Sequence, residues 1–181
     1  MRNKFLTTTL LALVALAAPA LRAENQAGTD FHKAAEVAGV MDRLESNALD
    51  VRQQAARLRS YNRTPTLYSW ELHADELNRI SGEMEQIAAL VQELTPIKPY
   101  MTFRQAAAFN HIVSLSARLS DATEEAIAVV NDQKARLRVG HPDYTTKVDA
   151  IYDHADLIAA HADSVEDWAE FIEELSNASD D

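Results

Sequence analysis

Histidine is the residue type in this chain with the widest range of site chemistry. Four of the six histidines, His73, His111, His154 and His161, fall on or beside the apolar stripes of long helix-forming segments. A neutral imidazole can bind a divalent metal ion, or the iron of a haem as an axial ligand. Metal sites in helical bundles usually take ligands three or four residues apart, and the sequence has no HxxH, HxxxH or ExxH pattern.

His73 and His154 are the best candidate pair for a divalent metal or a haem. If their helices begin near residues 65 and 143, the two imidazoles lie eight and eleven residues from the same end of the molecule. That places them within about one helical turn of the same level. His161 and His111 are further candidates, nearer the middle and a turn or two apart. In the simpler interpretation the histidines sit at stripe edges and hydrogen-bond to Asp or Ser, so we assign no metal and no cofactor.

The sequence carries no recognisable catalytic motif. It contains no cysteine, which excludes a disulfide framework, a thiolate metal site and a cysteine nucleophile. Its four glycines form none of the patterns GxGxxG, GxxxxGK(S/T) or GxSxG. Adjacent carboxylates such as Glu124 and Glu125 fit a solvated helix face and need no acid–base role. We therefore expect a protein that is not an enzyme.

Prolines divide the chain into four long segments that favour helix. Pro65, Pro96, Pro99 and Pro142 interrupt it, because proline breaks a helix interior but suits its first turn. The segments predict helices near 30–61, 65–94, 102–138 and 143–176. Thr64-Pro65 reads as an N-cap and first residue, residues 102–105 as a capping box, and Asp143 as the cap of the last helix.

Each segment has apolar residues at alternating three- and four-residue steps, which is the period of an amphipathic helix and not of a strand. Short connections make neighbouring helices antiparallel. The sequence therefore predicts an all-α fold, an antiparallel up-down-up-down four-helix bundle with long helices. A coiled-coil hairpin, or a dimer of hairpins, is the alternative. Because a single chain supplies four apolar stripes, they favour one core formed within that chain.

Residues 1–23 have the three parts of a secretory signal peptide. A basic start is followed by an uncharged apolar run over 5–18 and by small residues that offer cleavage after Ala20 or Ala23. An uncleaved anchor is the alternative, but the run is short for a span of about 20 residues. We expect cleavage after Ala23, a single domain over 24–181 with no membrane span, and a periplasmic or secreted location.

Charge is unevenly distributed along the chain. The formal net charge is −11, and it becomes −14 without the three bases of residues 1–23. Residues 143–181 alone carry −11, whereas 24–64 are neutral. Such a balance is the opposite of what a nucleic-acid binder needs. Alternating neutral and acidic helices would form ion pairs across the bundle and help to fix which helices are neighbours.

Basic and aromatic residues gather where the first and third helices finish and the second and fourth begin, an end that we name end A; the opposite end is end B. The residues expected there as a binding surface are Arg57, Arg59, Arg63, Arg136, Arg138, Tyr61 and Tyr68. Arginine and tyrosine are common anchors of protein interfaces. The sequence thus predicts an exported bundle that acts through a protein or cell-envelope partner. A periplasmic bundle that binds metal or haem through His73 and His154 is the alternative.

Overall fold

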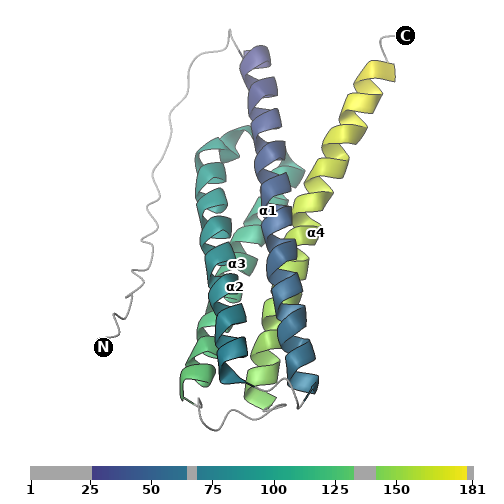
Figure 1. The fold of residues 1–181 in the computed structure, drawn as a ribbon. Helices are drawn as coiled ribbons and strands as arrows, with labels where there is room; N and C mark the ends of the chain where they lie inside the picture. The colour runs from purple at the N-terminus through teal and green to yellow at the C-terminus, as the bar shows by residue number, and fades with distance from the viewer. Residues whose placement is uncertain (1–25, 65–68, 133–141, 179–181) are drawn as a thin grey trace.

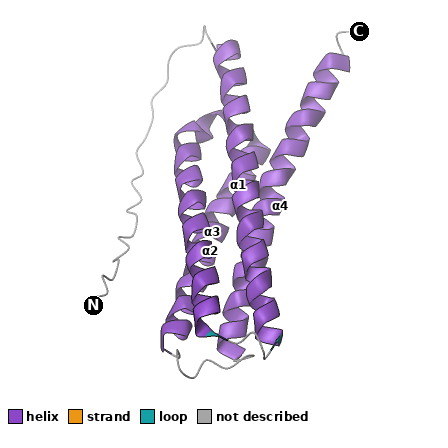
Figure 2. Cartoon of the chain, in the orientation of Figure 1, coloured by secondary structure: helices purple, strands orange, loops and turns teal. Residues whose placement is uncertain are grey.

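The computed structural model describes residues 26–64, 69–132 and 142–178, with side chains described from residue 33 to 165 apart from Ala34 and Ala35. Four α-helices span almost all of these residues: α1 Gln26–Arg63, α2 Trp70–Leu94, α3 Phe103–Asp132 and α4 Pro142–Ala178. A short 3₁₀ helix, η2 Thr95–Tyr100, joins α2 to α3. The described residues contain no strand (Figure 2).

The helices run alternately up and down around one core (Figure 1). Helix α1 packs against α2 and α4, and α3 packs against the same two helices, so neighbours in the sequence are neighbours in space. This confirms the predicted four-helix bundle and the closure of all four stripes within one chain. No helix in the described part of the chain is long and apolar enough for a membrane crossing. The segment interpreted as a signal peptide, with both cleavage positions, lies outside the described residues.

The helix boundaries confirm one predicted cap and correct two. The Thr102 backbone N–H donates to Gln105 Oε1 at 2.8 Å, and the Gln105 N–H donates to Thr102 Oγ1 at 3.2 Å, which is the reciprocal capping box. Thr64 instead ends α1, because its N–H donates to the Tyr61 carbonyl at 3.1 Å. Helix α2 begins five residues later than predicted, at Trp70.

The fourth helix begins at Pro142, so Asp143 is an acidic residue of the first turn and not the predicted cap. Proline suits this position because its missing N–H has no partner within a first turn. The third helix was predicted to reach 138, and residues 133–138 lie outside the described part of the chain. Pro96 and Pro99 both fall within η2, where the buried Ile97 closes the core between α2 and α3.

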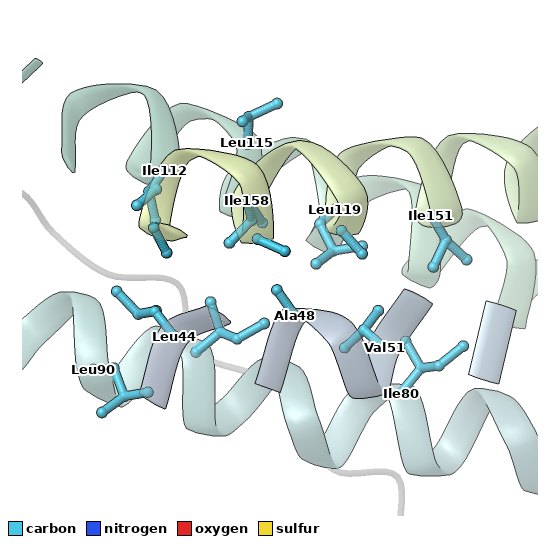
Figure 3. Packing of buried hydrophobic residues seen from close by; sticks show 14 of the residues in the cluster. Leu44, Ala48, Val51, Ile80, Leu90, Ile112, Leu115, Leu119, Ile151 and Ile158 are labelled. Atoms are coloured by element: carbon cyan, nitrogen blue, oxygen red, sulfur yellow. The ribbon is translucent and has the colours of Figure 1, made fainter. Parts of the chain in front are cut away.

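Alanines let the helices approach closely in the middle of the core. Ala48 of α1 points into the space between the helices, opposite Ile158 of α4 and Leu119 of α3 (Figure 3). All three side chains are buried. Protein interiors are close-packed, so a small residue facing larger ones leaves no room for an added side chain.

Ion pairs join α1 to both of its neighbours. Four arginines of α1 reach carboxylates on α2 or α4, and the pairs are Arg43–Glu93, Arg57–Glu76, Arg52–Asp156, Arg59–Asp149 and Arg59–Asp153. On the other side of the bundle, Lys147 of α4 pairs with Glu125 of α3. The expected alternation of charge is therefore present as contacts between adjacent helices.

The alanine at the centre of the core gives a stability prediction. Substituting Ala48→Leu forces a larger side chain into a fully packed space and should lower the free energy of unfolding by about 1–3 kcal/mol. The same change at the exposed Ala56 of α1 is the matched control and should be close to neutral. Urea unfolding followed by circular dichroism measures both. Equal urea midpoints for the two variants would contradict close packing around Ala48.

Candidate functional site

A histidine and two tyrosines from three helices close the core at end A. The Nδ1 atom of His73, in the first turn of α2, lies 2.8 Å from the hydroxyl oxygen of Tyr144, at the start of α4, and the two share a hydrogen bond. Their rings meet edge to face, with centroids 5.2 Å apart. Tyr61, in the last turn of α1, presents its ring edge-to-face to His73 at 5.9 Å. Three different helix ends are thereby joined around one imidazole.

His73 is held in its neutral form by its surroundings. Its side chain is completely buried, and burial lowers its pKa to about 4. Desolvation disfavours the charged imidazolium, and the contacts with Tyr61 and Tyr144 bring no negative charge to offset that cost. This histidine acts as the polar centre of an aromatic cluster that fastens α2 to α4.

His154 lies at a different level of the bundle. Ten residues of α4, about 15 Å of helix, separate it from Tyr144, which is the residue that contacts His73. Partial burial and the nearby Arg118 lower its pKa, while Asp153 raises it. The expectation that His73 and His154 share one level is wrong, because the late start of α2 moves His73 toward end A. Metal or haem binding by either histidine stays a prediction.

The two other candidate histidines form the pair that the structure does bring together. The rings of His111 on α3 and His161 on α4 are stacked, with centroids 4.9 Å apart and planes 7° from parallel. They were expected a turn or two apart, and that expectation is corrected. Partial burial, followed by the charge of His111, lowers the pKa of His161.

The relative register of α3 and α4 explains why these rings meet. Interactions between the two helices recur at seven-residue intervals: Glu125 pairs with Lys147, the charge of Arg118 acts on His154, and the ring of His111 stacks on that of His161. Each step is two helical turns, so antiparallel neighbours keep facing each other. In two antiparallel helices with a fixed register, the numbers of paired residues have a constant sum, and here that sum is 272 for all three pairs. That signal has meaning only once the neighbouring helices are known.

Arg59, expected on an exposed surface, makes contacts between α1 and α4 within the bundle. Its Nε atom lies 2.6 Å from Asp149 Oδ1, and one of its terminal nitrogens lies 3.1 Å from Asp153 Oδ1. The guanidinium also lies over the Tyr152 ring, 3.8 Å from the centroid. Only 24% of the side chain is exposed. A planar guanidinium that is both paired and stacked holds its orientation firmly, and here it joins α1 to α4.

The other residues predicted for end A differ in their surroundings. Arg57 lies 3.7 Å from the nearly buried carboxylate of Glu76, which Arg79 also contacts at 3.3 Å. Arg63 is exposed at the end of α1, and Tyr61 is half-buried. Arg136, Arg138 and Tyr68 lie outside the described residues. Within the described ranges, no three His, Asp or Glu side chains are grouped as a metal ion would require.

Comparison of the chain with protein-family models, with curated proteins and with solved structures finds no match.

The buried His73 predicts that stability depends on pH. A histidine with an ordinary pKa near 6.5 when unfolded and about 4 when folded binds more protons in the unfolded chain between these values. Stability from this group is complete above pH 6.5 and falls as the pH drops toward 4. At about 1.4 kcal/mol per pKa unit, the loss between pH 7 and pH 4.5 is about 2–3 kcal/mol.

Urea unfolding of the wild type and of His73→Gln at pH 7, 5.5 and 4.5 measures this loss. Both proteins have the same carboxylates, so the effect of their titration cancels when the two free energies of unfolding are subtracted. The wild type should lose stability relative to the variant as the pH falls. His111→Gln, at an exposed position, is the control and should follow the wild type more closely. Parallel pH profiles for wild type and His73→Gln would rule out the buried neutral imidazole.

Arg59 gives a second stability prediction. Removing its two ion pairs and its ring contact by Arg59→Ala should lower the free energy of unfolding by about 1–2 kcal/mol, since a partly buried network exceeds an exposed pair. Arg43→Ala removes a pair with Glu93 from a side chain that is 52% exposed, and should lose less than about 1 kcal/mol. Thermal or urea unfolding compares them. If Arg59→Ala loses no more stability than Arg43→Ala, the structural role inferred for Arg59 is wrong.

Proposed function

We propose that this protein is exported and acts without catalysis, by binding a protein or a component of the cell envelope through end A. The observation that carries the proposal is the surface that end A leaves exposed. The large apolar side chain of Leu72, in the first turn of α2, is 38% exposed. Arg63, at the end of α1, is exposed at the same end of the bundle. Arginine is enriched among the anchors of protein interfaces, and an exposed large apolar side chain adds surface that a partner can bury.

The interior supports an interaction role over an enclosed site. The described apolar stripes pack into one continuous cluster that runs from Val37 through Ile158 to Val165. Ligand pockets of enzymes and cofactor proteins are usually deep and mostly apolar. Here the space between the four helices is lined by buried apolar side chains of the chain itself, some of which Figure 3 labels. A surface interaction makes use of such a bundle without opening it.

The structure also changes which residues should be tested. Arg59 and Arg57 make ion pairs within the bundle, so charge reversal there would disturb helix packing as well as any partner. Arg63 and Leu72 are better probes, because they are exposed and a substitution leaves the described core intact. A partner with an acidic and partly apolar surface would complement them.

The decisive experiment compares two double variants of matched chemistry. Arg63→Glu with Leu72→Asn changes end A, while Arg118→Glu with Val113→Asn makes the same charge reversal on α3, away from end A, with Arg118 exposed and Val113 also 38% exposed. Envelope fractions are cross-linked to each purified protein, and captured components are quantified. We expect the end-A variant to capture its partner at least about tenfold less well, as loss of interface anchors does. Equal capture by both variants would overturn the proposal.

A further inference from the structure

At end B, α1 and α4 extend past the junction between η2 and α3 and diverge from each other (Figure 1). Two contacts give the level at which this η2–α3 junction meets the two longer helices. The Nζ atom of Lys33, on α1, lies 3.9 Å from the centroid of the Tyr100 ring. Phe103 lines one groove together with Val165 of α4. The part of α1 before Lys33 and the part of α4 after Val165 therefore lie beyond the junction, and we name them the arms.

The arms lack the two neighbours that the helices have in the middle of the bundle. They comprise residues 26–32 of α1 and 166–178 of α4, which are about 10 and 20 Å of helix. In the sequence, apolar residues at three- and four-residue steps continue into both arms, through Phe31, Ala34 and Val37 in α1 and Val165, Ala169 and Ile172 in α4. Such stripes stabilise a helix when another helix covers them. Helices α2 and α3, which cover the stripes elsewhere, do not extend to the arms.

The surface at the base of the arms is aromatic and exposed. Phe103, the first residue of α3, is 88% exposed, and Tyr100, the last residue of η2, is 50% exposed. Folding does not require a phenyl ring at this position, since the capping box of Thr102 and Gln105 already starts α3. Phenylalanine and tyrosine are enriched in the cores of protein interfaces. The junction therefore offers apolar area that a partner can bury.

The α4 arm and the η2–α3 junction have complementary charges. Residues 166–178 contain five carboxylates and no base, whereas residues 94–120 contain no carboxylate. Arg104 already interacts within the chain, so the available positive charge at the junction comes from Lys33 and Lys98. Neither lysine forms an ion pair with a described residue: one nitrogen lies over the Tyr100 ring, and the other donates to an amide oxygen at 2.7 Å.

The carboxylates farther along the α4 arm are the ones that a second molecule can meet. Glu170, Glu173 and Glu174 lie five to nine residues beyond Val165. That is about 7–14 Å along a helix that diverges from the junction of its own chain. Attraction between opposite charges at an interface favours the correct partner and fixes its orientation.

We propose that two copies of this chain associate end to end through end B, with the arms of each copy packed against those of the other. A two-fold axis across the length of the molecule makes the contacts identical in both directions. Two arms from each copy give four helices in the shared region, so the bundle continues from one chain into the next. The α4 arm reaches the junction of the second copy, where its carboxylates meet Lys33 and Lys98 and its apolar residues cover Phe103.

End A is left exposed at both extremities of this dimer. The association is therefore independent of the protein or envelope partner proposed above, and either proposal can fail without the other. The dimer would display two copies of end A, which strengthens the attachment to a partner that has several binding sites.

Sedimentation equilibrium of the protein, as its host processes it, measures the association. We expect a dimer with a Kd of about 10 μM or lower. Phe103→Asn with Lys98→Glu should weaken dimerisation at least about tenfold, as loss of interface anchors does. Val113→Asn with Arg118→Glu makes the same kinds of change on α3 outside the junction, and should dimerise as the wild type does.

A charge exchange tests how the two copies are oriented. Lys98→Glu makes the junction more acidic, and Glu170→Lys with Glu174→Lys makes one face of the α4 arm basic, since residues four apart share a face. Each of these two variants alone should dimerise at least about tenfold more weakly than the wild type. When they are mixed in equal amounts, opposite charges meet again at both junctions, so the mixed dimer should form nearly as well as the wild type. Restored association also shows that both variants are folded.

Three results would overturn the proposal. The first is a wild type that stays monomeric up to about 1 mM. The second is dimerisation of Phe103→Asn with Lys98→Glu that equals that of its control. The third is a mixture of the charge-exchanged variants that associates no better than either variant alone. A dimer that is lost only in Arg63→Glu with Leu72→Asn places the contact at end A and overturns it as well.

Discussion

Helix α1 must bury one apolar stripe completely while it lies between two acidic helices. Its buried residues, including Leu44, Ala48 and Val51, supply one side of the core. Arginines at the edges of that stripe reach carboxylates on α2 and on α4. Burial of the stripe drives association and has no preferred direction, whereas the ion pairs favour this neighbour order over others. With α2 and α4 as the neighbours of α1, α3 packs against the same two helices and completes the bundle.

The antiparallel register of α3 and α4 turns a periodic sequence into a line of polar contacts. Because residues seven apart return to the same face, a single aligned pair such as Glu125 and Lys147 fixes the partners further along. His154 is thereby placed beside Arg118, and His111 against His161. The same periodicity that builds the core therefore determines which polar side chains of α3 and α4 are adjacent.

Local patterns were sufficient for the fold, because each helix carries its own amphipathic period and the capping box at Thr102 involves residues only three apart. The start of α2 was missed because Thr64-Pro65 satisfies the rules for a helix start, whereas Thr64 follows the end of α1 and α2 begins at Trp70. That offset moved His73 away from His154. The stacking of His111 on His161 depends on alignment between two helices, which no single segment specifies. Likewise, nothing in a sequence separates an exposed arginine from one that is paired, as Arg59 is.

The four helices differ in length, and this has a mechanical consequence. Helices α1 and α4 have 38 and 37 residues, against 25 in α2 and 30 in α3. Toward end B, α1 and α4 continue beyond the η2 connection and diverge (Figure 1). A helix turn with one neighbour is more easily opened than one enclosed by three. The molecule thus combines a shaft of four packed helices with a forked extension, and backbone hydrogen exchange is expected to be faster in the fork than in the shaft.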